Sequence, residues 1–317
     1  MSAPANTITT LNTIGIREDL EDVIYRVAPE ETPFVSNIGT AKAMQTYHEW
    51  QTETLANPSA TNAALEGDAF TPAAGNFTTR IGNYCQISTK VYGVSRTDEI
   101  VKKAGRASEL NRQKLLKAIE CRKDVEMRVI GNYASNAESG GTARKTAGAL
   151  AWITTNTSVG SGGSNGGFSA GVVSAATNGT LRNFAESQVK AVQSACFSSG
   201  GKPTMAFMGP TSKQEFSAFT GIAQIRKDAP GEKQATIVGA ADVYVGDFGN
   251  LTLMPHPYGL TRDCLIIDPK MWAMGILDGY KSKPVPTATD GEQYSLTFEG
   301  CLVSRNEKAS GVVRDIQ

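Results

Sequence analysis

The chain has 317 residues, with 31 Lys or Arg and 31 Asp or Glu, so its formal net charge is zero. This balance gives no electrostatic reason to expect a nucleic acid or a membrane as partner, and no apolar run approaches the roughly 18 residues of a membrane span. The length allows two or three lobes with hydrophobic cores, and the N-terminus lacks the basic and apolar regions of a secretory signal peptide.

The cysteines are dispersed along the chain and form no Cys-x-x-Cys pair (Cys85, Cys121, Cys196, Cys264 and Cys301). The sequence therefore predicts neither a zinc site nor a disulfide framework, and a reduced, cytoplasmic place of synthesis fits best.

Residues 1–40 are predicted to form an N-terminal arm with one short helix. The first 16 are rich in Thr, Asn and Ala and lack a core of their own. An amphipathic helix is predicted over 17–28, with an apolar stripe of Leu20, Val23, Ile24 and Val27 and with Pro29 as its end. Its acidic flank fits either a solvated face or an arm that docks on a basic surface of a neighbour. Thr32-Pro33-Phe34 reads as a turn that carries an anchoring aromatic ring.

Residues 41–95 are predicted to form an extended loop, a β-ribbon of two long strands at 45–55 and 77–95. Both stretches are rich in strand-forming residues, and the segment between them is small, polar and turn-rich. The second strand alternates, with one side formed by Phe77, Ile81, Cys85, Ile87 and Val91. A two-stranded ribbon is marginal alone in water, so it folds back on its own domain or crosses a neighbouring subunit, and we favour the neighbour.

The strongest helical signal covers about 108–134, in a predicted peripheral domain of residues 96–184. Ser108 is a plausible N-cap, and one face carries Leu115, Ala118, Ile119, Arg122, Val125 and Val129. Such a helix would be about 40 Å long. We expect it to act as a spine across the domain, because no second heptad stretch is present to form a coiled coil.

The spine helix has a basic bias. Between Lys102 and Arg128 there are nine basic residues and four acidic ones. The pattern fits a solvated helix or a surface for an acidic neighbour such as residues 18–31, with Lys114 and Lys117 as candidate contacts. A nucleic-acid face is the alternative, but no aromatic residues are interleaved.

A Gly-rich insertion at 160–167 reads as a flexible loop. Gly162 to Gly166 matches the G-x-S-x-G pattern around Ser164, but Gly and Ser flank it where a nucleophile elbow needs a strand and a helix. The run also fails the G-x-G-x-x-G spacing and has no Walker A lysine.

A second, axial domain is predicted over 185–285, followed by return strands at 286–317. Its expected elements are a helix at 181–197, a strand at 203–208, a helix capped by Thr211, and strands at 234–245, 251–254 and 265–267. The return strands are expected to pack beside the spine helix, which makes the second domain an insertion into the first.

The sequence argues against an enzyme. His48 lies in a polar strand and His256 lies between two prolines, and neither has a carboxylate or cysteine at ligand spacing. We therefore predict no catalytic, cofactor-binding or metal-binding residue and no cofactor. An arm and a ribbon without cores of their own are typical of a protein completed by assembly.

The order of parts resembles the tailed-phage major capsid proteins of the Hong Kong 97 fold. The local match lies in EETPFVSNIG at 30–39, NYCQISTKVYGVSRTDEIVKKAG at 83–105, LIIDPKMWAMGIL at 265–277 and VSRNEKASGVV at 303–313. The resemblance implies an α+β capsid fold with an N-terminal arm, an extended loop, a spine helix in a peripheral domain and an inserted axial domain.

The resemblance also implies function. Copies would form pentamers and hexamers through the axial lobe and link laterally through the loop and arm. They would build an icosahedral or prolate virion capsid, assembled in the host cytoplasm, that encloses double-stranded DNA without reading its sequence. Portal, scaffolding and decoration proteins are the expected partners, with no membrane. Because the arm begins almost at Met1, any scaffold is expected to be a separate protein.

Two other classes stay open. One is an encapsulin-type compartment shell, which has the same fold but an enzyme cargo in place of DNA. The other is a serine hydrolase that uses Ser164.

Overall fold

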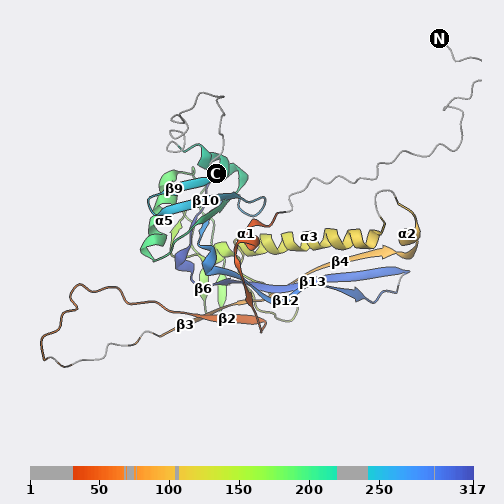
Figure 1. The fold of residues 1–317 in the computed structure, drawn as a ribbon, viewed down its shortest axis with the longest axis horizontal. Coiled ribbons are helices and arrows are strands. Elements are labelled where there is room, and N and C mark those ends of the chain that lie inside the picture. The colour runs from red at the N-terminus through yellow and green to blue at the C-terminus, as the bar shows by residue number, and fades with distance from the viewer. Residues whose placement is uncertain are drawn as a thin grey trace, which may run out of the picture.

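The computed structural model describes residues 31–67, 69, 75, 77–103, 107–219, 242–288 and 290–317. The predicted α+β class is confirmed, because a long helix lies along one sheet and a second sheet with its own helices forms a lobe at one end (Figure 1). The predicted helix at 17–28 lies outside the described residues.

A four-stranded sheet carries the elongated part of the molecule. Its order is β1 (Gly39–Lys42), β12 (Trp272–Val285), β13 (Gly291–Ser304) and β4 (Gln86–Ser95). β12 and β13 are each 14 residues long and pair antiparallel, and β13 also pairs antiparallel with β4. The return strand β13 packs against α3, as predicted.

The helix α3 (Glu109–Ile130) is the predicted spine. Ser108 is its N-cap and accepts a hydrogen bond from Asn111 N, which confirms the predicted start. The helix ends at Gly131, so the predicted extension to 134 is wrong, because Gly131 leaves the helical conformation after 22 residues. Cys121, Val125 and Val129 are buried, whereas Leu115 of the predicted stripe is 61% exposed.

The ribbon is shorter than predicted. β2 (Tyr47–Thr52) pairs antiparallel with β3 (Thr79–Tyr84), and the chain then bends at Cys85 into β4, which pairs with β13 instead. The predicted single strand over 77–95 is therefore wrong. The reason is the buried Asn83, whose amide donates to Leu302 O (2.8 Å) and pulls this end of the ribbon into the core. Beyond the bend, Ile87 and Val91 lie on the exposed face.

A six-stranded sheet forms the second lobe. Its order is β5 (Thr157–Ser158), β14 (Gly311–Val313), β11 (Cys264–Ile267), β8 (Met205–Met208), β10 (Gly249–Pro255) and β9 (Val243–Gly246). The helices α5 (Glu186–Ser198) and α6 (Pro210–Ser217) belong to this lobe. Thr211 is not the cap of α6, because Gly209 occupies that position with Pro210 behind it. Most of the strand expected at 234–245 lies outside the described residues.

Strand pairing changes two expected boundaries. β12 starts at Trp272 in the four-stranded sheet, although 185–285 was expected to be axial. Conversely, β14 pairs with β11 and β5, so the end of the return segment 286–317 joins the second lobe.

The Gly-rich segment is held in place instead of forming the loose loop expected from its composition. The carboxylate of the buried Asp315 accepts hydrogen bonds from Gly160 N (3.1 Å) and Gly179 N (2.9 Å). A Cβ on Gly160 would lie 2.3 Å from Thr180 O, so the close approach of the two chain segments requires glycine there. The small hairpin β6 (Gly167–Ser169) and β7 (Val172–Ser174) and the helix α4 (Ala149–Trp152) pack nearby.

Short elements complete the chain. α1 (Pro33–Asn37) replaces the predicted turn, α2 (Arg96–Ile100) links β4 to α3, and the 3₁₀ turns η1 (Pro269–Met271) and η2 (Glu307–Ala309) flank β12 and β14. The expected anchoring aromatic of this region is confirmed, because Phe34 is fully buried.

Phe34 joins the arm to the core. Its ring meets Phe207 of β8 edge-on at 5.6 Å and Trp272 of β12 at 6.3 Å, so it touches both sheets. We expect Phe34→Ala to lower the free energy of unfolding of the subunit by about 3–5 kcal/mol, because it removes a fully buried ring. Urea unfolding of the unassembled subunit measures this.

The matched control is Phe77→Ala, because Phe77 is 93% exposed. We expect its effect to stay within about 0.5 kcal/mol. Equal effects of the two substitutions would contradict the anchoring role of Phe34.

Candidate functional site

The arm is fastened to the spine helix by one buried carboxylate. Glu126 Oε1 accepts a hydrogen bond from Phe34 N (2.6 Å), and Oε2 accepts one from Val35 N (2.9 Å). These are backbone donors at the start of α1, where a helix leaves its N–H groups unpaired. A charged carboxylate therefore has both a hydrogen-bonding and a dipolar reason to lie there.

His256 completes this arrangement from the second lobe. Its Nε2 lies 2.9 Å from Glu126 Oε1, and both side chains are fully buried. The next residues of the same loop reach the arm, because the Tyr258 hydroxyl donates to Glu31 O (2.7 Å). Arm, spine helix and second lobe thus meet at one point, which we call the arm anchor (Glu126, His256, Tyr258, Phe34 and Val35).

The sequence reasoning missed the arm anchor. His256 has no carboxylate near it in sequence, and its partner lies 130 residues away. The available signal was Glu126 itself, because it follows Val125 and precedes Val129 and Ile130 on a helix turn that is buried. A carboxylate in such a place requires hydrogen-bond donors from elsewhere in the fold.

The ribbon is fixed at its base. Trp50 Nε1 donates to Ser304 O (2.7 Å), and the Tyr47 hydroxyl donates to Gly171 O (3.0 Å). The Tyr47 and Tyr84 rings lie 4.6 Å apart across the strand pair. These contacts set the direction in which the ribbon leaves the body.

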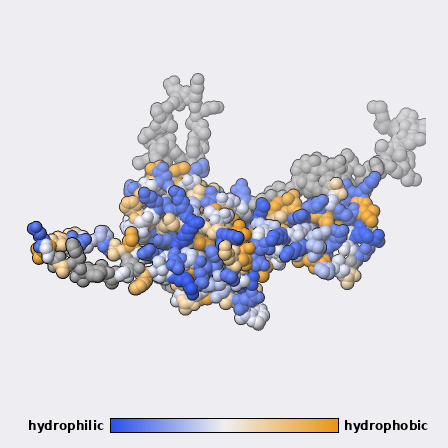
Figure 2. Space-filling view, turned by 60° about the horizontal axis from the view of Figure 1, so that its bottom comes forward, coloured by the Kyte–Doolittle hydropathy of each residue, from blue (hydrophilic) through white to orange (hydrophobic). Residues whose placement is uncertain are grey.

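Beyond the paired strands, the loop carries apolar side chains into solvent. Leu55, Leu65 and Phe77 are 90%, 81% and 93% exposed. Figures 1 and 2 show this part standing clear of the body. Large apolar side chains exposed to this degree on a projecting hairpin are typical of a surface that is covered in an assembly.

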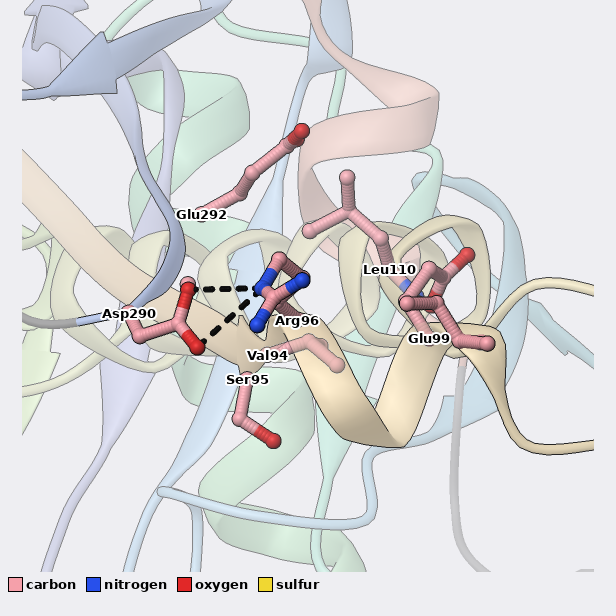
Figure 3. Close-up of a pocket in the computed structure, with 9 residues that line it drawn as sticks. Val94, Ser95, Arg96, Glu99, Leu110, Asp290 and Glu292 are labelled. Carbon is pink, nitrogen blue, oxygen red and sulfur yellow. Dashed lines mark hydrogen bonds and ion pairs between the residues drawn. The ribbon is translucent and has the colours of Figure 1, made fainter.

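The opposite end of the molecule holds a cavity of about 410 Å³ (Figure 3). Arg96 closes one side with two hydrogen bonds to Asp290, at 3.0 and 3.1 Å. Ile100 beside it is 71% exposed. The lining mixes apolar residues with this ion pair.

Glu99 supports the start of α3 at this end. Its Oε2 accepts hydrogen bonds from Glu109 N (3.1 Å) and Leu110 N (3.3 Å). The Ser108 hydroxyl, these two backbone N–H groups and the Lys103 charge lower the pKa of the Glu99 carboxyl. Glu99 and Ser108 therefore share the capping of the spine helix.

The structure does not bring together the residues that were considered as catalytic or metal-binding groups. Ser164 is exposed, pairs through its backbone with Thr177 and is followed by strand β6, so the strand-to-helix turn of a nucleophile elbow is missing. His48 lies against Trp50, with ring centroids 5.8 Å apart, and burial lowers its pKa. In the described ranges, no three His, Cys, Asp or Glu side chains gather as a metal site, and no helix is long and apolar enough to cross a membrane.

Comparison with known proteins decides between the remaining interpretations. The family model described as SU10 major capsid protein matches residues 3–317, nearly the whole chain. The chain belongs to the SU10 major capsid protein family. It is a structural component of the virion capsid of a tailed phage, and neither the compartment-shell nor the hydrolase alternative is favoured.

Individual relatives agree with this assignment. The major capsid protein of Escherichia phage Phieco32 is 34% identical over 108 residues, which are 34% of this chain and 31% of that protein's length, so the match spans about a third of the relative. Among solved structures, the cyanophage A-1(L) capsid shares 10% identity at a TM-score of 0.67 and covers 98% of this chain and 99% of its own. The capsid of a native GTA particle shares 13% identity at a TM-score of 0.61, with 95% and 96% covered. These likenesses show that the capsid fold is shared.

The arm anchor can be tested by removing its carboxylate. We expect Glu126→Ala to speed amide hydrogen exchange at Phe34 and Val35 by roughly 30-fold, because leaving their N–H groups unpaired costs about 2 kcal/mol. Glu126→Gln keeps an acceptor oxygen and should have a smaller effect. Exchange followed by mass spectrometry on peptides that cover 31–38 measures the change.

Glu120→Ala on the same helix is the matched control, because Glu120 is a partly exposed partner of Lys117. Unchanged exchange of the arm in Glu126→Ala, or equal acceleration in both variants, would contradict the anchor.

The lowered pKa of Glu99 predicts a loosening of α3 in acid. A carboxyl whose folded pKa lies below its unfolded value of about 4.3 stabilises the fold above that value, and the contribution is lost as the pH falls through the folded pKa. We expect the protection factors of Glu109 and Leu110 to fall as the pH is lowered from 7 towards 3. In Glu99→Gln they should start lower and change less.

Glu292→Gln, which changes another carboxylate of the same cavity, serves as the control and should keep the wild-type pH dependence. A wild-type pH dependence in Glu99→Gln would contradict the capping role of Glu99.

Proposed function

We propose that this capsid protein assembles as pentamers and hexamers, with the lobe of the six-stranded sheet, which holds roughly residues 185–271, as an axial domain at the capsomer centres. Lateral links are made by the extended loop and the N-terminal arm. The resulting icosahedral or prolate shell encloses double-stranded DNA and assembles in the host cytoplasm. The protein acts by binding other copies and carries out no catalysis.

The observation that supports this proposal best is the projecting ribbon with its exposed Leu55, Leu65 and Phe77. A hairpin of six residue pairs is marginal in water, and its tip has no partner surface within the described part of this subunit. Lying across a neighbouring subunit would cover these side chains and leave the base hydrogen bonds in place.

Other partners are proposed from the family. A portal and a scaffolding protein are expected to take part in assembly. A decoration protein is a further candidate, because the similar capsid structure from phage G comprises decoration proteins as well as major capsid proteins. Contact with DNA is expected to be independent of sequence.

Negative-stain microscopy and analytical ultracentrifugation of the full chain test the proposal, with the chain alone and with a candidate scaffolding protein of the same phage. Closed shells are the expected result, and DNA as the content of particles from infected cells would separate a capsid from a shell with protein cargo. A persistent monomer under all these conditions would overturn the proposal.

The role of the loop can be tested separately by deleting 56–76. The deletion leaves strands β2 and β3 joined by about five residues, a common hairpin length. Because Trp50 and Asn83 still hold the base, we expect an unchanged unfolding midpoint but loss of shells in electron micrographs. Normal particles from this variant would count against the intersubunit role of the loop.

A further inference from the structure

The outward side of α3 is a second surface that the described part of the chain leaves partly exposed. We call it the open face, and it consists of Arg112, Leu115, Leu116, Ile119, Arg122 and Lys123. Their spacing of i, i+3, i+4, i+7, i+10 and i+11 places them on one side of the helix, away from Cys121 and Val125, which pack on the sheet. Leu115 is 61% exposed and Arg122 is exposed, whereas the other four residues are half-buried.

Positive charge on the C-terminal half of this face is not neutralised locally. Lys117 and Asp124, on the other side of α3, have their own partners in Glu120 (2.8 Å) and Lys90 (2.7 Å). Arg122 lies over the Tyr280 ring at 5.7 Å. Over the described ranges, no carboxylate lies within ion-pair distance of Arg122 or Lys123.

These contacts revise the residues expected to meet an acidic neighbour. Lys117 is already paired with Glu120. Arg122 and Lys123 flank an apolar strip instead. A partner for this face needs both an apolar stripe and acidic flanks.

The arm of the same subunit already binds this side of α3 near the C-terminal end of the helix. Glu126 and Ile130 continue the row of Ile119 and Arg122, and Glu126 binds the first N–H groups of α1. The open face, from 112 to 123, is about 18 Å long at 1.5 Å per residue. It therefore extends an established arm-binding surface.

We propose that residues 17–28 of a second copy of this chain dock on the open face. This segment has the matching pattern, with Leu20, Val23, Ile24 and Val27 as its stripe and with Asp19 and Glu21 beside the stripe. As a helix it would be about 18 Å long, the length of the open face. The inference rests on the proposed function, because shell assembly is what brings a second copy's arm to this helix.

Charge exchange tests the complementarity. We expect Arg122→Glu with Lys123→Glu to raise the critical concentration of assembly at least tenfold, without a change in the unfolding midpoint of the subunit. Asp19→Lys with Glu21→Lys should act in the same way, and combining all four substitutions should restore assembly to within about threefold of wild type. Additive losses in the combined variant would overturn the proposal.

The control reverses two exposed lysines elsewhere, Lys145→Glu with Lys202→Glu, which changes the net charge equally. It should assemble like the wild type. An equal loss in the control would show an effect of net charge alone and overturn the proposal.

Cross-linking identifies the source of the segment. All five native cysteines are buried, so Ile24→Cys with Ile119→Cys supplies the accessible thiols, at the middle of the segment and of the open face. A bismaleimide should convert assembled particles into covalent multimers on a denaturing gel, whereas each single substitution should not. Monomers that are cross-linked internally, or no cross-link at all, would overturn docking by a second copy. If the wild-type chain still forms shells when the cross-link is absent, only the docking proposal fails. If the wild-type chain forms no shells, the docking proposal and the proposed function both fail.

Discussion

The buried Glu126 carboxylate determines how the parts of this subunit are placed. An ionised carboxylate without partners is very costly in a protein interior, so its position is tolerated only if donors surround it. Here the hydrogen-bond partners come from segments remote in sequence, namely the N–H groups of Phe34 and Val35 in the arm and the ring of His256 in the second lobe. The need of this buried carboxylate for hydrogen-bond partners therefore holds together the spine helix, the start of the arm and the loop after β10. Moving any of them leaves a buried polar side chain or a backbone N–H without its hydrogen-bond partner.

The C-terminal residues place the second lobe on the elongated part in a similar way. The chain passes between the two sheets from β11 to β12 and again from β13 to β14. At the end of the second passage, Asp315 has a left-handed φ of 59° and pairs with Arg262 at 2.9 Å while holding Gly160 and Gly179. These covalent crossings join the lobe to the four-stranded sheet, and the contacts of Asp315 hold the ends of the lobe's own segments together.

The sequence allowed local structure to be predicted where local rules decide it. Ser108 caps α3, Met205–Met208 and Cys264–Ile267 are buried strands, and the hairpin at the base of the ribbon pairs as expected. The break at Cys85 could not be seen, because alternation continues unchanged through it and the groups that hold Asn83 inward, Leu302 O and Thr146 Oγ1, are distant in sequence. For the same reason, Glu126 and His256 could not be paired, since nothing local to either residue indicates the other. The Gly-rich segment was misjudged because its order depends on Asp315, 155 residues away from Gly160.

The ribbon and the open face of α3 are joined through the four-stranded sheet. Trp50 and Asn83 hydrogen-bond to β13, and β13 packs against α3, so the ribbon base, the sheet and the helix form a continuous rigid path. The arm also leaves near the C-terminal end of that helix, at Glu126. A neighbour that fixes the ribbon tip therefore also fixes the direction of the spine and the starting point of the arm. A subunit that is already held by one contact has less translational and rotational freedom left to lose. Each contact formed on such a rigid body therefore lowers the entropic cost of the next contact. Several intersubunit contacts of low individual affinity can thus stabilise the shell together, although no one of them alone would make free subunits associate.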